Sequence, residues 1–225
     1  GDEGLFLDSE EHKQLQIELG KVKTAGPLES ELTGSVTKLD DRIERHIENV
    51  MALDLVNVDA IRELRPKVVI DAINGAGSEA LPAFLERIGC EVFPINCDND
   101  GNFVHTPEPL PENLMELRRT VSRVGADLGI ATDPDADRLA VIDGYGNPLV
   151  EEYTLVLAAY HALRHAAEHD RRPLVTNLSS TKALDDLAER YGRRVLRTPV
   201  GEIHVARKMQ QLDTLIGGEG NGGVI

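Results

Sequence analysis

The sequence predicts an α/β protein built from two tandem doubly wound α/β/α domains, each with a mixed, mostly parallel sheet. From Val68 onward, short apolar runs alternate with longer segments of helical periodicity. This order is typical of sheets that carry helices on both faces. The alternation begins again near Val150, which indicates a second unit, and 225 residues suffice for two small domains.

The chain divides into three expected segments. Residues 1–37 are expected to be the tail of an N-terminal domain plus a linker, residues 38–148 a first α/β domain, and residues 149–225 a second. Both ends look abrupt, because the chain begins as if within a domain and stops at "GGVI" as if before a further strand. We therefore expect a piece of a longer protein.

The elements follow from apolar periodicity and from Gly and Pro at segment ends. In the N-terminal segment, a helix within 4–20, begun at Asp8 or Ser9, precedes a linker at 21–35. In the first domain the expected helices are 38–55, 78–89 and 111–125, and the expected strands are 67–72, 91–95, 126–131 and 139–143. In the second domain the expected helices are 151–169, 180–192 and 201–211, and the expected strands are 173–178, 194–198 and 213–217.

Composition and charge exclude several classes of protein. The chain has 24 basic and 39 acidic residues, a net charge of −15, and no basic stripe, so we expect no nucleic-acid binding. No apolar run approaches the roughly 20 residues of a membrane span, and no signal peptide is visible at the N-terminus. Cys90 and Cys97 lack a metal-binding spacing and are expected to be reduced thiols. A cytoplasmic location is the expectation.

The stretch "ATDPDADRLAVID" carries the strongest functional signal. Asp133, Asp135 and Asp137 follow an expected strand and precede Arg138. Ligands of doubly wound sheets bind at the carboxyl ends of the strands. Three crowded carboxylates repel one another unless a cation neutralises them, and Mg²⁺ prefers such oxygen ligands. The spacing therefore predicts a Mg²⁺ site.

Other metal-using motifs fit less well. An EF-hand loop would need Gly at position 138 and Glu at position 144, where this chain has Arg138 and Gly144. A phosphatase with an aspartyl nucleophile, of the haloacid dehalogenase type, wants Thr or Val at the position of Asp137. A glycosyltransferase D-x-D motif stays open but leaves Asp137 and Arg138 without a role.

Several motifs of the sequence resemble those of the α-D-phosphohexomutases. "DPDADR" resembles their metal loop, D-G-D-[GA]-D-R, and "GGEGNGG" (217–223) resembles their sugar-binding loop. "RTPVGEIHVARKM", "DAINGAG" and "DGNFVHTPEPLPENL" also resemble segments of this family. The motifs occur in the family's order and span nearly the whole chain.

The resemblance implies a phosphoryl transfer between the 1- and 6-positions of a hexose, through a phosphoserine enzyme and a bisphosphorylated sugar. Mg²⁺ would be held by Asp133, Asp135 and Asp137. Arg138 would approach the transferred group as the catalytic residue, although a salt bridge within the acidic cluster is the other interpretation. The chain contains no segment like the family's phosphoserine loop and no fourth domain. By this comparison it is the end of domain 1, domain 2 and most of domain 3, and it is expected to be inactive alone.

The sugar loop would bind hexose hydroxyls through Glu219 and Asn221, because a carboxylate accepts hydrogen bonds and an amide both donates and accepts. The implied substrate is a glucose, mannose or glucosamine phosphate, and the sequence does not choose among them or set an oligomeric state. Many members have His in place of Glu202, so that residue receives no role. The alternative function is a non-catalytic module that binds metal and sugar phosphate.

Two further features are interpreted as structural. His161, His165 and His169 recur at a spacing that could bind metal, but they lie opposite the apolar stripe of their helix and are expected to face solvent. "NGAG" (74–77) lacks a complete phosphate-binding pattern and is expected to be a tight turn between a strand and a helix.

Overall fold

The computed structural model describes residues 7, 9–25, 35–39 and 41–225. The chain divides into two compact units, residues 1–42 and 43–225. In the first unit α1 spans Ser9–Ala25. It continues through the first part of the expected linker, so that expectation is wrong for 21–25; an i,i+3 pair, Lys21–Glu18 at 2.7 Å, supports the last turns. The expected start at Asp8 lies outside the described residues.

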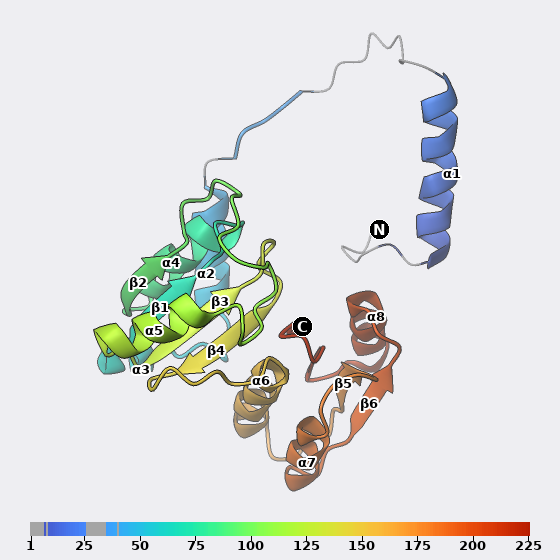
Figure 1. Cartoon of the computed structure of the whole chain (residues 1–225). Coiled ribbons are helices and arrows are strands. Elements are labelled where there is room, and N and C mark those ends of the chain that lie inside the picture. Colours follow the sequence, from blue (N-terminus) through green and yellow to red (C-terminus); the bar gives the residue numbers. More distant parts are fainter. Residues whose placement is uncertain (1–6, 8, 26–34, 40) are drawn as a thin grey trace. The chain divides into compact units, whose positions relative to one another are not determined.

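The second unit contains two sheets with helices on both faces (Figure 1). The first half consists of α2 (Arg42–Met51), α3 (Val58–Leu64), β1 (Lys67–Asp71), α4 (Gly77–Arg87), β2 (Glu91–Ile95), α5 (Met115–Val124), β3 (Leu128–Thr132) and β4 (Leu139–Asp143). The second half consists of α6 (Glu152–His165), β5 (Leu174–Asn177), α7 (Ala183–Arg190), β6 (Val195–Thr198), α8 (Glu202–Leu212) and β7 (Ile216–Gly218).

The first sheet has the order β2-β1-β3-β4, in which β3 and β4 are antiparallel and the other pairs are parallel. Its central strand β1 is buried on both faces, which explains the unbroken apolar run in "KVVID". One face packs against α5, around Leu117 and Val121. The other packs against α4, around Leu85, with apolar residues of α2 and α3 beside it. Pro94 lies in β2, at the edge of the sheet, where a missing N–H is tolerated.

The second sheet has the order β6-β5-β7, and all of its strands are parallel. The helices α6 and α7 pack on one face around Leu155 and Leu184. The helix α8 contacts all three strands and buries Val205 and Ala206. After β7 the chain turns back: Gly217 and Ile225 exchange two backbone hydrogen bonds of 3.0 and 2.8 Å. This return pairs with β7 in the antiparallel sense.

The fold class is confirmed, and the strands lie within one to three residues of their expected limits. The short helix α3 was not expected. Helix α6 ends at His165 rather than at 169, because the backbone becomes extended at Ala166. In the turn that follows, the N–H of Asp170 donates to the carbonyl of Ala167, and the Asp170 carboxylate accepts from Arg172 and Arg193. His169 is therefore not on the helix. Helices α2, α5 and α7 begin later than expected, at Arg42, Met115 and Ala183, and α2 ends earlier, at Met51 rather than at 55.

Candidate active site

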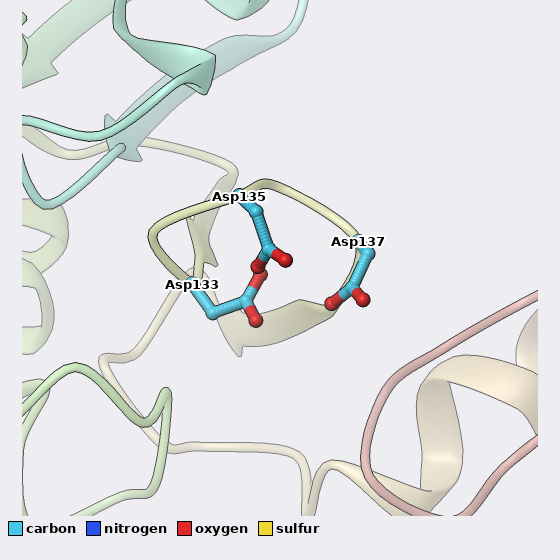
Figure 2. A group of neighbouring side chains, drawn as sticks. All are labelled: Asp133, Asp135 and Asp137. Atoms are coloured by element: carbon cyan, nitrogen blue, oxygen red, sulfur yellow. The ribbon is translucent and has the colours of Figure 1, made fainter. Parts of the chain in front are cut away.

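The acidic loop between β3 and β4 gathers the three predicted aspartates. One carboxylate oxygen from each of Asp133, Asp135 and Asp137 lies within 4.8 Å of the others. Figure 2 shows the three side chains converging on the inside of the loop. Asp133 is buried directly after the strand, whereas Asp135 and Asp137 are exposed. The structure therefore brings together, at the carboxyl end of β3, the residues that the sequence singled out.

Backbone contacts hold the acidic loop in shape. The N–H of Arg138 donates to Asp133 Oδ1 at 3.1 Å, and the N–H of Ala136 donates to the carbonyl of Asp133 at 3.1 Å. The N–H of Ala76, at the start of α4, donates to the carbonyl of Pro134 at 2.8 Å. A Cβ on Gly75 would lie 2.5 Å from that same oxygen. The "NGAG" segment is thus the expected tight turn, and it supports the acidic loop.

The acidic loop carries more negative charge than its one arginine balances. Burial raises the pKa of the Asp133 carboxyl to about 6, and the neighbouring Asp137 and Asp135 carboxylates raise it too, against a lowering by the Arg138 N–H. Arg138 Nε lies 3.7 Å from an oxygen of Asp133 and 3.7 Å from one of Asp137. A bound cation would relieve this repulsion, and carboxylate oxygens are the ligands that hard divalent ions prefer.

The glycine-rich loop after β7 holds its carboxylate firmly. Glu219 is 9% exposed, and its Oε1 accepts hydrogen bonds from Asn177 Nδ2 at 2.6 Å and from the N–H of Gly201 at 2.9 Å. Asn177 ends β5, and Gly201 immediately precedes α8. Within the described chain Oε2 of Glu219 has no hydrogen-bond partner. One oxygen of this carboxylate is therefore fixed by the protein, and the other is available.

Asn221 forms the tip of the same loop. Its Oδ1 accepts from the N–H of Gly223 at 3.1 Å, which leaves the amide N–H groups to donate elsewhere. Gly222 has a φ of +97°, and a Cβ there would lie 2.7 Å from the carbonyl oxygen of Leu139. Glycine is required at this position by both its conformation and the close approach.

The acidic loop and the glycine-rich loop are joined. The N–H of Leu139 donates to the carbonyl of Gly222 at 3.1 Å, and Arg138 and Gly223 form an antiparallel bridge. Thr154 Oγ1, on α6, donates to the carbonyl of Leu139 at 2.5 Å. A pocket of about 410 Å³ lies beside this junction. Its polar lining is formed by Asp137, Arg138, Glu202, Glu219 and Asn221.

Glu202 also lines the pocket, although no role was predicted for it from the sequence. It is the first residue of α8 and is half-buried. Burial raises the pKa of its carboxyl, and the charges of Asp137, Glu219 and Asp135 add to the rise. The sequence also missed Asn177, which orients Glu219. Its position at the carboxyl end of a buried strand was a usable signal.

The histidines do not form a metal site. Within the described part of the chain, the one group of three or more potential metal ligands is the aspartate triad. His161 and His165 are exposed, and the centroids of their rings are 4.2 Å apart. A ring nitrogen of His161 lies 2.8 Å from the carbonyl oxygen of Leu55, so this side chain has a structural contact.

Fold and site together define an α/β protein with a candidate cation site and a candidate polyol-binding loop at one pocket. The chain belongs to the phosphoglucomutase/phosphomannomutase family. The family's alpha/beta/alpha domain II matches residues 44–146, and its alpha/beta/alpha domain III matches residues 151–225. The resemblance found in the sequence is thereby confirmed. The domain limits at 37/38 and 148/149 stay predictions.

Individual relatives agree with this assignment. A phosphoglucomutase/phosphomannomutase of Thermococcus kodakarensis is 38% identical over 99% of the chain. A probable phosphoglucosamine mutase of Methanopyrus kandleri is 34% identical over 84%. The crystal structure of a family protein from Burkholderia thailandensis superposes with a TM-score of 0.78 at 26% identity over 94% of the chain. The chain covers 45%, 40% and 44% of these proteins, so it spans less than half of their length.

Proposed function

We propose that this chain is part of a phosphohexomutase, an enzyme that moves a phosphoryl group between the 1- and 6-positions of a hexose through a phosphoserine and a bisphosphorylated sugar. The observation that carries the proposal is the shared pocket. Asp137 and Arg138 from the acidic loop line it together with Glu219 and Asn221 from the glycine-rich loop. A phosphoryl group and a sugar must meet in one place for this reaction, and two joined loops of different chemistry supply such a place.

In this proposal Asp133, Asp135 and Asp137 hold Mg²⁺. The excess of carboxylates over cations in the acidic loop and the raised pKa of the Asp133 carboxyl both fit a divalent ion. When bound, Mg²⁺ supplies neutralisation of the negative charge on the phosphoryl oxygens. Arg138 contributes planar donors to the same group, a role that suits phosphoryl transfer because such reactions depend on positioning and charge stabilisation.

Glu219 and Asn221 bind the hydroxyls of the sugar. The free Oε2 of Glu219 accepts from a hydroxyl, and the amide of Asn221 donates. The hexose phosphate must be bound in two opposite orientations, once for each phosphorylated position. A carboxylate suits this demand because it accepts from neighbouring hydroxyls on either face of the ring.

The proposal includes a cytoplasmic location for the enzyme. The free thiols of Cys90 and Cys97 support a cytoplasmic location. In the described residues no helix combines the length and apolar character needed to cross a membrane. We expect this chain alone to lack turnover, because no segment around its serines resembles the phosphoserine loop of the family. If the activity were absent from the complete gene product as well, a module that binds metal and sugar phosphate would be the remaining function.

Glu219→Gln in the complete gene product tests the proposal. Loss of a charged partner for a hydroxyl costs about 1.5–3 kcal/mol, or one to two decades in kcat/KM, and both the 1-phosphate and the 6-phosphate should be affected. Glu189→Gln on the exposed face of α7 is the matched control and should retain activity. Full activity of Glu219→Gln in both directions would remove the sugar-binding role of the glycine-rich loop.

A further inference from the structure

Glu202 presents an uncommitted carboxylate to the pocket. It begins α8, next to Gly201, whose N–H is held by Glu219. Within the described part of the chain, Glu202 makes no hydrogen bond and no ion pair. Glu219, by comparison, has one oxygen engaged by two donors. A half-buried carboxylate without a protein partner is costly unless a ligand supplies the missing interaction.

The N-terminus of α8 contributes some positive potential to Glu202, but the side chains that line the pocket give it no cationic partner. Arg138 is the single cationic residue in the lining, and it lies between Asp133 and Asp137. A divalent ion on the acidic loop, together with Arg138, would balance the three aspartates. The charges of Glu202 and Glu219, and those of the ligand's own phosphate, would still be unbalanced. The sugar side of the pocket therefore favours a positively charged group on the ligand.

We propose that Glu202 selects a hexose phosphate that carries a protonated amino group on its ring. This inference rests on the proposed function and names the substrate class of the same site. A neutral hydroxyl can donate to Glu202, but only an ammonium group both donates and balances the charge. An acetylated amine carries no charge, so it gains no electrostatic attraction to the Glu202 carboxylate. The raised pKa of Glu202 agrees with the shortage of positive charge around it.

The test compares the affinities of three ligands for the complete gene product, by NMR titration in saturating Mg²⁺. The ligands are glucosamine 6-phosphate, glucose 6-phosphate and N-acetylglucosamine 6-phosphate. Glucosamine 6-phosphate should bind about tenfold more tightly than either of the others, the size of one charge-assisted hydrogen bond. Glu202→Gln should bring the ratio of affinities close to one, whereas Glu189→Gln should leave the ratio as it is.

A pH series separates charge recognition from a structural effect of the substitution. An amino group beside electron-withdrawing oxygens titrates near the range of an α-amino group, about 8. The preference for glucosamine 6-phosphate should therefore be present at pH 6.5 and disappear at pH 9 in the wild type. In Glu202→Gln the ratio should not change with pH.

The outcomes distinguish this inference from the proposed function. If no sugar phosphate binds, or if Glu219→Gln leaves all three affinities unchanged, the proposed function itself fails. If binding depends on Glu219 but shows no preference for the amine, or if the preference survives in Glu202→Gln, only the selection by Glu202 is wrong.

Discussion

The two halves of the second unit repeat one architecture with different loop chemistry. In β1-α4-β2-α5-β3 and in β5-α7-β6-α8-β7, the first strand lies in the middle, the second at an edge and the third on the other side (Figure 1). In both, a candidate site loop follows the third strand, and the chain then returns antiparallel, as β4 in the first half and as residues 223–225 in the second. The same scaffold thus offers two equivalent loop positions.

The loops at these positions are stabilised in opposite ways. The acidic loop has three mutually repelling carboxylates and one arginine, and under the proposed function a cation relieves this repulsion. The glycine-rich loop has one carboxylate, whose orientation is already fixed by donors from Asn177 and Gly201. We therefore expect the acidic loop to bind a ligand that completes the loop, and the glycine-rich loop to bind a ligand that enters a preformed site.

The largest effect should come from removing a ligand of the acidic loop. Asp135 is exposed and makes no hydrogen bond within the described residues, so Asp135→Ala should not disturb the fold. We expect Mg²⁺ affinity to fall by about 100-fold or more, because the loss of one carboxylate removes both a ligand and a charge. Calorimetric titration of the chain measures it.

The controls for that titration are substitutions of carboxylates outside the acidic loop. Glu219→Gln changes a carboxylate of the glycine-rich loop, and Asp186→Ala changes an exposed carboxylate on α7. Both should bind Mg²⁺ like the wild type. Equal affinities for Asp135→Ala and Asp186→Ala would mean that the acidic loop is solvated surface and not a metal site.

A smaller effect should follow from disturbing the junction of the two loops. Gly222 combines a φ of +97° with a contact to the Leu139 carbonyl, whereas Gly101 has a φ of +72° and open space around it. Gly101→Ala should cost about 1 kcal/mol of unfolding free energy, and Gly222→Ala about 2–3 kcal/mol. Urea unfolding followed by circular dichroism gives both values. If the two costs were equal, the close contact between the loops would contribute nothing beyond backbone strain.

The sequence predicted the acidic loop because its signal is local. Three aspartates, a preceding apolar strand and the rule for strand ends were enough to place Asp133, Asp135 and Asp137 together. The end of a buried strand marked Asn177 as a polar residue of this edge, but its contact with Glu219 was not predictable in the same way. Asn177 and Gly201 are 42 and 18 residues away from it along the chain, and only the strand order β6-β5-β7 brings all three to one edge.

The prediction of the fold from local sequence has the same limit: strands were predicted, but the end of one helix was not. Strands such as "EVFPI" (91–95) were predictable because apolar runs between glycines and helices mark them. The end of α6 was not, because the apolar pattern continues through Ala166 and Ala167. The backbone is extended at Ala166, and the segment that follows is held by Asp170, which binds Arg172 and also Arg193 beyond α7. The local apolar pattern therefore predicted the elements but not the limit of α6, beyond which one contact comes from a distant part of the chain.

The smallest expected effect is a pH dependence of stability that differs between the two halves of the second unit. The folded pKa of Asp133, about 6, lies above its ordinary value of 3.8. Between these values the folded state holds a proton that the unfolded state has lost, so stability without metal should fall as pH rises from 4 to 6. Asp170 in the second half behaves oppositely: hydrogen bonds from Arg172 lower its pKa, so its contribution is lost only as pH falls below 4.

Urea unfolding of the wild type and of Asp133→Asn at pH 4.5 and 6.5, in a chelator, isolates the contribution of Asp133. Asparagine retains the acceptor for the N–H of Arg138 but cannot titrate. The exposed neighbours Asp135 and Asp137 are screened by water, so we expect a difference of only about 1 kcal/mol between the two pH values. Saturating Mg²⁺ should reverse the sign in the wild type, because the ion binds the deprotonated carboxylates and so stabilises the fold more at higher pH. The wild type and Asp133→Asn could instead show the same change of unfolding free energy with pH in chelator. The Asp133 carboxyl would then not be destabilised in the folded state, and the contrast between the two loops would be lost.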